Sequence, residues 1–185
     1  MEKIFKLGLV LGRFNHIHNG HKQIINASRK VCEKTLILVG SAQESGTLRN
    51  PFKLETRQKA IARIYNTDDV IIGALKDYTN EKDISPAWGR YILENVNKDY
   101  GKLPDLMIYG KDESRKGWFS DEDSKKFSEL IISRDKIKIS ATELRKYMVD
   151  NREEKWREFV PEEIWDMYDE LREELMMVEC YKNMR

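Results

Sequence analysis

The sequence predicts an α/β fold in which a parallel β-sheet is covered by helices on both sides. Short apolar runs alternate with helix-like segments along the chain, and this is the pattern of βαβ units. The runs lack the polar alternation of a half-exposed strand, so each strand should be buried on both faces. Gly12, Ser41 and Gly110 stand at or just after the ends of such runs, where parallel sheets bind ligands.

The N-terminal part predicts two strands, each followed by a helix. The apolar run Ile4–Leu11 predicts the first strand, and Asn19–Glu33 follows with apolar residues at helical spacing. Thr35–Gly40 is a second apolar run, and it predicts a second strand. Leu54–Tyr65 then carries apolar residues three and four apart on one face, which predicts the second helix.

The next part continues the same alternation. Val70–Gly73 predicts a third strand, Pro86–Val96 a helix and Asp105–Gly110 a fourth strand. The short apolar segment Leu130–Ile132 is a candidate for a fifth strand. A further helix is expected to begin at Ser140, because apolar residues recur at helical spacing after it.

The chain is expected to form a single domain over residues 1–185, with a core at 1–150 and a C-terminal helical extension at 151–185. Pro161–Met177 predicts one helix: Pro161 suits a first helical position, and two glutamates follow it where they complement the helix dipole. We expect this helix to pack on the core or on another subunit.

Composition excludes several classes of function. The net charge of +1 makes no case for a nucleic-acid partner. No apolar stretch reaches the roughly 20 residues needed to span a bilayer, so no membrane partner is expected. The two cysteines form no metal or disulfide pattern, and a reducing, cytoplasmic location is the default expectation.

The segment His18-Asn19-Gly20-His21 directly precedes and opens the first predicted helix. Two imidazoles three residues apart share a face, and the helix N-terminus provides backbone N–H groups and a positive dipole end for phosphate. Surface histidines or metal ligands are the alternatives. All three histidines lie within six residues, and neither a cysteine nor a second histidine pair accompanies them at zinc spacing, so phosphate binding is the favoured interpretation.

A second motif begins at Ser140. Ser140 and Glu143 fit a capping box, which explains both residues without a ligand. It does not explain Thr142 and Arg145, which lie three apart near the positive end of the same predicted helix. These two side chains are suited to hold the terminal phosphates of a nucleotide.

These motifs carry a resemblance to a known family. Gly12-Arg13-Phe14 with His18-Asn19-Gly20-His21, and Ile139-Ser140-Ala141-Thr142-Glu143-Leu144-Arg145, resemble the HxGH and ISxTxxR signatures of the nucleotidyltransferase superfamily. The stretch 40–52 is most similar to archaeal-type nicotinamide mononucleotide adenylyltransferases, including the N-terminal domain of bifunctional versions fused to a Nudix domain. The similarity covers most of residues 4–165, and no Nudix domain fits in the remainder.

The resemblance implies a Rossmann-like, doubly wound parallel sheet of the nucleotidyltransferase type with C-terminal helices. It implies that ATP and nicotinamide mononucleotide react to give NAD and pyrophosphate without a covalent enzyme intermediate. Mg²⁺ is expected to accompany the ATP, with no metal site on the protein itself. Because family members are often oligomeric, a homo-oligomer is also an expectation.

The resemblance also implies roles for individual residues. The expected catalytic residues are His18, His21, Arg13, Arg49 and Arg145. The expected nucleotide-binding residues are Gly12, Arg13, Phe14, His18, Gly20, His21, Gly110, Asp112, Ile139, Ser140, Thr142 and Arg145. The expected acceptor-binding residues are Ser41, Asn50, Phe52 and Trp88. Trp88 matches the position where the family stacks an indole on the nicotinamide ring, and the alternative is a core or interface tryptophan. The loop 77–80 would then line the same pocket.

The sequence departs from the family pattern at two places. Asn15-His16-Ile17 stands where Gln-Pro-Phe is usual. We expect His16 to be exposed, with contact to the second substrate as the alternative. The segment 109–112 is closer to the bifunctional pattern, and Lys111, Arg115 and Lys116 can equally be read as a solvated charge run.

Two further functions remain open. The same chemistry can use another acceptor, such as nicotinate mononucleotide or phosphopantetheine, or can use CTP. A non-catalytic nucleotide-sensing module is the second class. A module that has lost catalysis should lose its phosphate-binding residues, yet His18, His21, Thr142 and Arg145 are all present.

Overall fold

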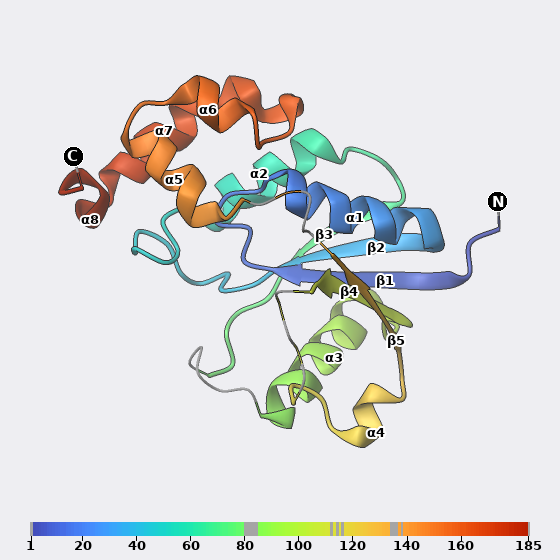
Figure 1. The fold of residues 1–185 in the computed structure, drawn as a ribbon. Coiled ribbons are helices and arrows are strands. Elements are labelled where there is room, and N and C mark those ends of the chain that lie inside the picture. Colours follow the sequence, from blue (N-terminus) through green and yellow to red (C-terminus); the bar gives the residue numbers. More distant parts are fainter. Residues whose placement is uncertain are drawn as a thin grey trace.

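The computed structural model describes residues 2–79, 85–111, 113, 115, 117–133, 137 and 139–184. Its centre is a five-stranded parallel sheet in the order β3-β2-β1-β4-β5 (Figure 1). The strands are β1 (Phe5–Gly12), β2 (Cys32–Val39), β3 (Val70–Ala74), β4 (Leu106–Gly110) and β5 (Ser128–Ile132). The order reverses between β1 and β4, so a crevice for a ligand is expected at their carboxyl ends. The predicted parallel sheet is confirmed.

The central strands are buried on both faces. In β1, Leu7, Leu9 and Leu11 belong to the hydrophobic cluster on one side of the sheet, whereas Val10 belongs to the cluster on the other side. In β2 the same division separates Leu36 and Leu38 from Ile37 and Val39. Two buried faces require apolar residues at consecutive positions, which is why these strands appear as unbroken apolar runs.

Helices cover the two faces unequally. The α1 helix (Asn19–Val31) and the α2 helix (Leu54–Ile64) lie on one face, together with the C-terminal helices (Figure 1). The α3 helix (Pro86–Tyr100) and the short α4 helix (Asp121–Ser124) lie on the other. Strand β2 begins at Cys32, earlier than the expected start at Thr35. The search for an apolar run missed these first residues because they include the polar pair Glu33-Lys34 at the exposed end of the sheet.

The C-terminal extension differs from the single helix that was expected at 161–177. After α5 (Ala141–Val149), the chain forms α6 (Glu153–Arg157), a 3₁₀ helix η1 (Glu162–Met167), α7 (Tyr168–Met177) and α8 (Glu179–Lys182). Ile164 and Met167 are both buried, and their spacing of three residues fits the three-residue turn of a 3₁₀ helix. A uniform α-helix was therefore the wrong prediction for the first part of this segment.

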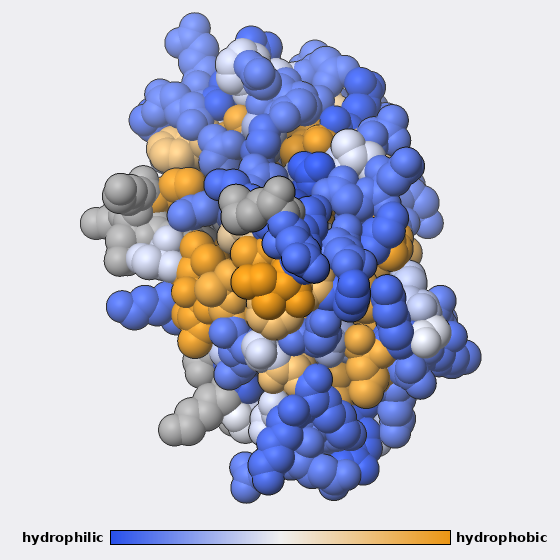
Figure 2. Space-filling view, turned by 90° about the vertical axis from the view of Figure 1, so that its right-hand side faces the viewer, coloured by the Kyte–Doolittle hydropathy of each residue, from blue (hydrophilic) through white to orange (hydrophobic). Residues whose placement is uncertain are grey.

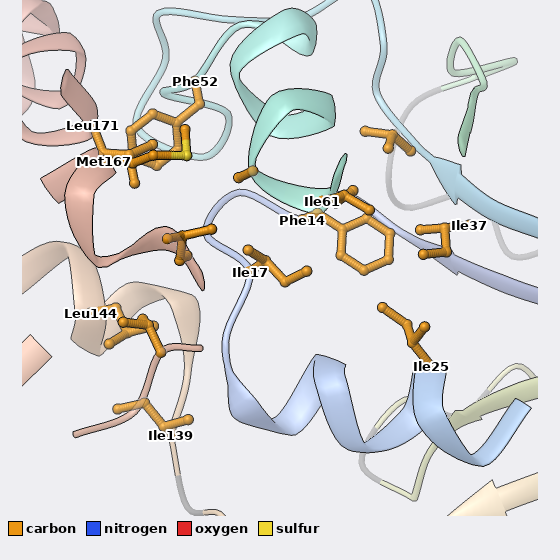
Figure 3. Close-up of a cluster of buried hydrophobic side chains, with 14 of the residues drawn as sticks. Phe14, Ile17, Ile25, Ile37, Phe52, Ile61, Ile139, Leu144, Met167 and Leu171 are labelled. Carbon is orange, nitrogen blue, oxygen red and sulfur yellow. The ribbon is translucent and has the colours of Figure 1, made fainter. Parts of the chain in front are cut away.

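The extension packs on the core of its own chain. Figure 3 shows Phe14 and Ile17, from the loop between β1 and α1, within a cluster that includes Phe52, Met167 and Leu171. Ile139 and Leu144, at the start of α5, belong to the same cluster. The loop that carries the histidine motif is thus buried against the C-terminal helices.

On the face seen in Figure 2, hydrophobic residues lie near the centre among mostly hydrophilic ones. None of the helices in the described part of the chain is long and apolar enough to cross a membrane.

Candidate active site

The histidine motif caps the N-terminus of α1. His18 is the N-cap residue, and its Nδ1 accepts a hydrogen bond from the backbone N–H of Gly20 at 3.1 Å. The His21 Nδ1 accepts from the backbone N–H of His18 at 3.3 Å, which completes a capping box made of two imidazoles. The ring centroids are 3.9 Å apart. The three-residue spacing of the two histidines in the sequence places both rings at this helix end.

This capping arrangement determines which nitrogen of each ring carries the proton. Because both Nδ1 atoms accept hydrogen bonds, each neutral ring has its proton on Nε2. The Nε2–H of each ring lies at a helix end that favours anions. The structural role of the two rings and a role in phosphate binding are compatible.

The carboxyl ends of β1 to β4 and the segments that follow them enclose a cavity of about 620 Å³. Gly12 and Arg13 line it from the end of β1, and Gly40 and Ser41 line it from the end of β2. Asp77 follows β3 and Arg115 follows β4. The remaining lining residues are Leu11, Glu44, Arg49, Asn50, Leu75, Thr79, Trp88, Glu113 and Trp118. The cavity lies where the switch in strand order predicts a ligand.

Three predicted arginines lie close enough to influence one another. Desolvation lowers the pKa of Arg13, and the neighbouring cations of Arg49 and Arg145 lower it further. Arg13 and Arg49 both line the cavity. Positive charges that repel each other in this way are stabilised when a polyanion such as a triphosphate binds between them.

Arg145 is largely committed to the protein itself. It is only 7% exposed, and its guanidinium donates to the Asn15 carbonyl at 2.7 Å, to the Tyr181 hydroxyl at 2.7 Å and to Thr142 Oγ1 at 3.1 Å. Within the described part of the chain, these bonds use three of its five N–H groups.

The start of α5 follows the capping box that the sequence predicts. Ser140 Oγ accepts from the backbone N–H of Glu143 at 3.2 Å, and the Glu143 carboxylate accepts from the Ser140 N–H at 3.0 Å. The Ser140 hydroxyl also donates to that carboxylate. Ser140 is therefore explained by capping, and Thr142 serves at least as an acceptor for Arg145.

The predicted acceptor residues divide into two groups. Ser41, Asn50 and Trp88 line the cavity. Phe52 does not, since its side chain is 1% exposed and belongs to the hydrophobic core. The prediction of acceptor contact for Phe52 is corrected, because the chain turns it towards α7 rather than the strand ends. In the loop after β3, Asp77 and Thr79 line the cavity as expected, while Asn80 lies outside the described residues.

Other predicted nucleotide-binding residues are placed as follows. Phe14 is buried, and its ring lies 5.1 Å from that of His21. Ile139 is buried in the core, and Gly110 is the buried last residue of β4. Phe14 and Ile139 therefore belong to the hydrophobic core and do not line the cavity. Asp112 lies outside the described residues.

His16 corrects the expectation of an exposed side chain. It is 3% exposed; its Nδ1–H donates to the Ile17 carbonyl at 2.8 Å, and its Nε2 accepts from the Trp156 indole at 2.7 Å. Burial lowers the pKa of His16 to about 4, because charge is costly in this apolar surrounding. At the position where the family pattern usually has proline, this chain has a neutral ring with one donor and one acceptor.

Arg57 is a site-building residue that the motifs do not reveal. This buried side chain of α2 donates from Nη1 to the Arg13 and Gly40 carbonyls and from Nη2 to the Ser41 and Glu44 carbonyls, at 2.8 to 3.3 Å. Its Nε donates to the carbonyl of Lys53. The loops after β1 and β2 are thereby joined. One feature of the sequence could have indicated that Arg57 is buried, namely its position on the apolar face of the predicted helix.

Arg115 and Trp118 were also missed. Arg115 is 7% exposed and donates to the Leu11 carbonyl at 2.6 Å, which contradicts a solvated charge run at this position. Its guanidinium lies 4.8 Å from the Trp118 ring, and that ring is 6.0 Å from the ring of Trp88. Lys111 is exposed, and Lys116 lies outside the described residues.

Gly89 explains how the two indoles come together. Its N–H donates to the Trp118 carbonyl at 2.9 Å, and a Cβ at Gly89 would lie 2.1 Å from that oxygen. Only a residue without a side chain allows this approach. Within the described ranges, no group of three or more His, Cys, Asp or Glu side chains could hold a metal ion.

A parallel sheet of this order, with capping histidines at α1 and arginines around a cavity at the strand ends, defines an α/β protein of the nucleotidyltransferase class. More narrowly, the chain belongs to the cytidylyltransferase-like family, whose model matches residues 9–147.

Among curated proteins, a nicotinamide-nucleotide adenylyltransferase of Methanococcus vannielii is 30% identical over 166 residues, covering 88% of this chain and 87% of that protein. The enzyme of the same name from Thermococcus sibiricus is 28% identical over 170 residues, covering 89% of this chain and 84% of its own.

Two solved structures share the fold. A bifunctional NMN adenylyltransferase/ADP-ribose pyrophosphatase from Francisella tularensis, complexed with AMP and a manganese ion, has a TM-score of 0.69 at 20% identity. The alignment covers 97% of this chain and 52% of that one, so this chain spans about half of the bifunctional protein. A nicotinic acid mononucleotide adenylyltransferase from Plasmodium falciparum has a TM-score of 0.51 at 14% identity, covering 89% and 98%.

Proposed function

We propose that this protein transfers AMP from ATP to nicotinamide mononucleotide, giving NAD and pyrophosphate. The observation that carries the proposal is that one cavity combines two arginines, Arg13 and Arg49, with two indoles, Trp88 and Trp118. The acceptor has a phosphate at one end and an aromatic pyridinium ring at the other. The names of the curated relatives support the same reaction.

In this reaction a phosphate oxygen of the acceptor attacks the α-phosphorus of ATP. A new P–O bond forms as the bond to the β-phosphate bridging oxygen breaks, and pyrophosphate leaves with that electron pair. The Nε2–H groups of His18 and His21 would donate to the phosphates that gain charge. Arg13 and Arg49 would hold the two anionic reactants together against their repulsion.

The acceptor ring would lie against the indoles. An electron-poor pyridinium is attracted to the face of tryptophan, and this attraction strengthens when water is excluded. Trp88 is 9% exposed, so its available surface faces the cavity that it lines.

Mg²⁺ would enter as part of the ATP complex and lower the charge of the phosphates. We further propose a cytoplasmic enzyme and a homo-oligomer; the oligomeric state is tested by light scattering of the purified protein.

One observation favours a second acceptor, nicotinate mononucleotide. Arg115 lines the cavity as a buried cation that pairs with Glu113 at 3.4 Å, and its Nε has no hydrogen-bond partner among the described residues. Burial lowers the pKa of Arg115 more than Glu113 raises it, so a second carboxylate would further stabilise its charged form. Nicotinate carries that carboxylate on its ring, whereas nicotinamide carries a neutral amide.

The test is pyrophosphate release with ATP and Mg²⁺ against nicotinamide mononucleotide, nicotinate mononucleotide and phosphopantetheine, with CTP and a no-acceptor control in parallel. Fast release with nicotinamide mononucleotide, with NAD as the product, is the expected result. Preference for nicotinate mononucleotide that Arg115→Met removes would establish the second candidate. Nucleotide binding without turnover on any acceptor would contradict both and favour a sensor.

A further inference from the structure

We propose that Tyr181, in the last helix of the C-terminal extension, is a positioning residue that sets the Arg49 loop and Arg145 relative to each other. The proposal rests on the proposed adenylyl transfer, because Arg49 and Arg145 are assigned to the phosphates of that reaction. Tyr181 lies outside residues 9–147, which the family model matches.

The Tyr181 hydroxyl joins two segments of the site directly. It accepts a hydrogen bond from Arg145 Nε at 2.7 Å and donates to the Leu48 carbonyl at 2.7 Å. Leu48 immediately precedes Arg49 in the chain. One oxygen atom therefore connects the arginine at the start of α5 with the residue before the arginine of the loop.

A hydroxyl is required because the same atom must both donate and accept. Burial raises the pKa of Tyr181, so the proton that Leu48 receives stays in place. Phenylalanine would fill the same space but would leave the buried Nε of Arg145 and the Leu48 carbonyl without this partner. Packing and positioning can thus be separated by a single-atom change.

The loop depends on this contact more than the rest of the site does. Residues 43–49 are exposed, and the Leu48 side chain is 53% exposed, so little packing holds this part of the loop. Arg145, in contrast, is also bonded to Asn15 and Thr142. Loss of the Tyr181 hydroxyl should therefore release the loop that carries Arg49 while Arg145 stays largely in place.

The consequence concerns the transition state. Charge builds up on the phosphates as pyrophosphate leaves, and a misplaced donor costs most at that point. The effect should therefore appear mainly in kcat, while the KM for nicotinamide mononucleotide changes little, since binding of its ring is assigned to the indoles rather than to the Arg49 loop.

The experiment compares Tyr181→Phe with Tyr168→Phe in the full chain. Tyr168 is a matched control, because it is buried in the same extension but its hydroxyl has no hydrogen-bond partner among the residues that the structure describes. We expect Tyr181→Phe to lower kcat about tenfold, with KM within about twofold of wild type, and Tyr168→Phe to leave both unchanged. Equal kcat values for the two variants would overturn the proposal.

Hydrogen exchange separates failure of this proposal from failure of the proposed function. Amides of residues 44–50 should exchange faster in Tyr181→Phe than in wild type or Tyr168→Phe, whichever substrate the enzyme uses. Unchanged exchange in this loop would contradict the positioning role. Faster exchange together with no turnover in wild type would contradict only the assigned reaction.

Discussion

The indole of Trp156 donates a hydrogen bond to the His16 imidazole at 2.7 Å and so joins the C-terminal extension to the loop that precedes His18 and His21. Both side chains are buried, and their rings pack edge to face with centroids 5.5 Å apart. The bond requires a neutral imidazole, because a protonated Nε2 cannot accept.

This relationship predicts that stability falls in mild acid. The pKa of His16 is about 4 in the fold and 6.5 in the unfolded chain, so the unfolded state binds the proton first. The contribution is complete above pH 6.5 and is lost as the pH falls towards 4, by about 3 kcal/mol in total. Urea unfolding between pH 7.5 and 4 measures it.

The matched variant for this prediction is His16→Asn, which offers an acceptor but does not titrate. The difference in unfolding free energy between wild type and variant should shrink as the pH falls. A pH-independent difference would show that His16 does not carry the effect.

Arg57→Lys should destabilise the protein and lower its activity. The guanidinium bonds five carbonyl oxygens, and an ammonium cannot reach them all. We expect a loss of about 3 kcal/mol in unfolding free energy. Arg63→Lys on the same helix, where the arginine pairs with Asp166 in solvent, should change it by less than about 0.5 kcal/mol. Similar losses for both variants would refute the assigned role.

Gly89→Ala should weaken binding of the acceptor ring. The added methyl group would displace the Trp118 carbonyl and the Phe119 ring, which moves Trp118 away from Trp88. We expect the KM for nicotinamide mononucleotide to rise about tenfold, corresponding to one lost aromatic contact. Gly101→Ala at the end of α3, where nothing lies near the added atom but φ is 71°, should reduce stability without changing KM.

His21→Asn should separate capping from catalysis. The asparagine oxygen can still accept from the His18 N–H, but the ring N–H that we propose to donate to phosphate is gone. We expect kcat to fall about a hundredfold or more, with folding preserved in thermal unfolding and ATP binding preserved in calorimetry. An unchanged rate would remove the phosphate-binding assignment.

The sheet was predictable because strands such as β1 and β2, buried on both faces, leave an unbroken apolar run. Motifs next to those runs drew attention to Trp88, which lines the cavity, and to His18 and His21, which cap α1 and do not line it. The break between η1 and α7 was not predictable, because apolar spacing of three and four residues fits either kind of helix.

Arg57, Arg115 and His16 show why the rest of the site was missed or misplaced. A charged or titratable residue is most often exposed, so sequence reasoning assigns it to solvent. Here each is buried by partners distant in the chain: carbonyl groups from two loops for Arg57, the Leu11 carbonyl for Arg115, and the Trp156 indole for His16. Such pairings become visible only in the folded structure.

The placement of α8 against the Arg49 loop has a consequence for biosynthesis. The histidine motif and the loop precede Tyr181 in the chain, so the ribosome makes them first. A nascent chain would therefore hold the side chains proposed to bind phosphate before it holds the residue proposed to align two of them. A chain that is interrupted before Tyr181 should therefore fall short of the full rate even when the rest of the site is complete.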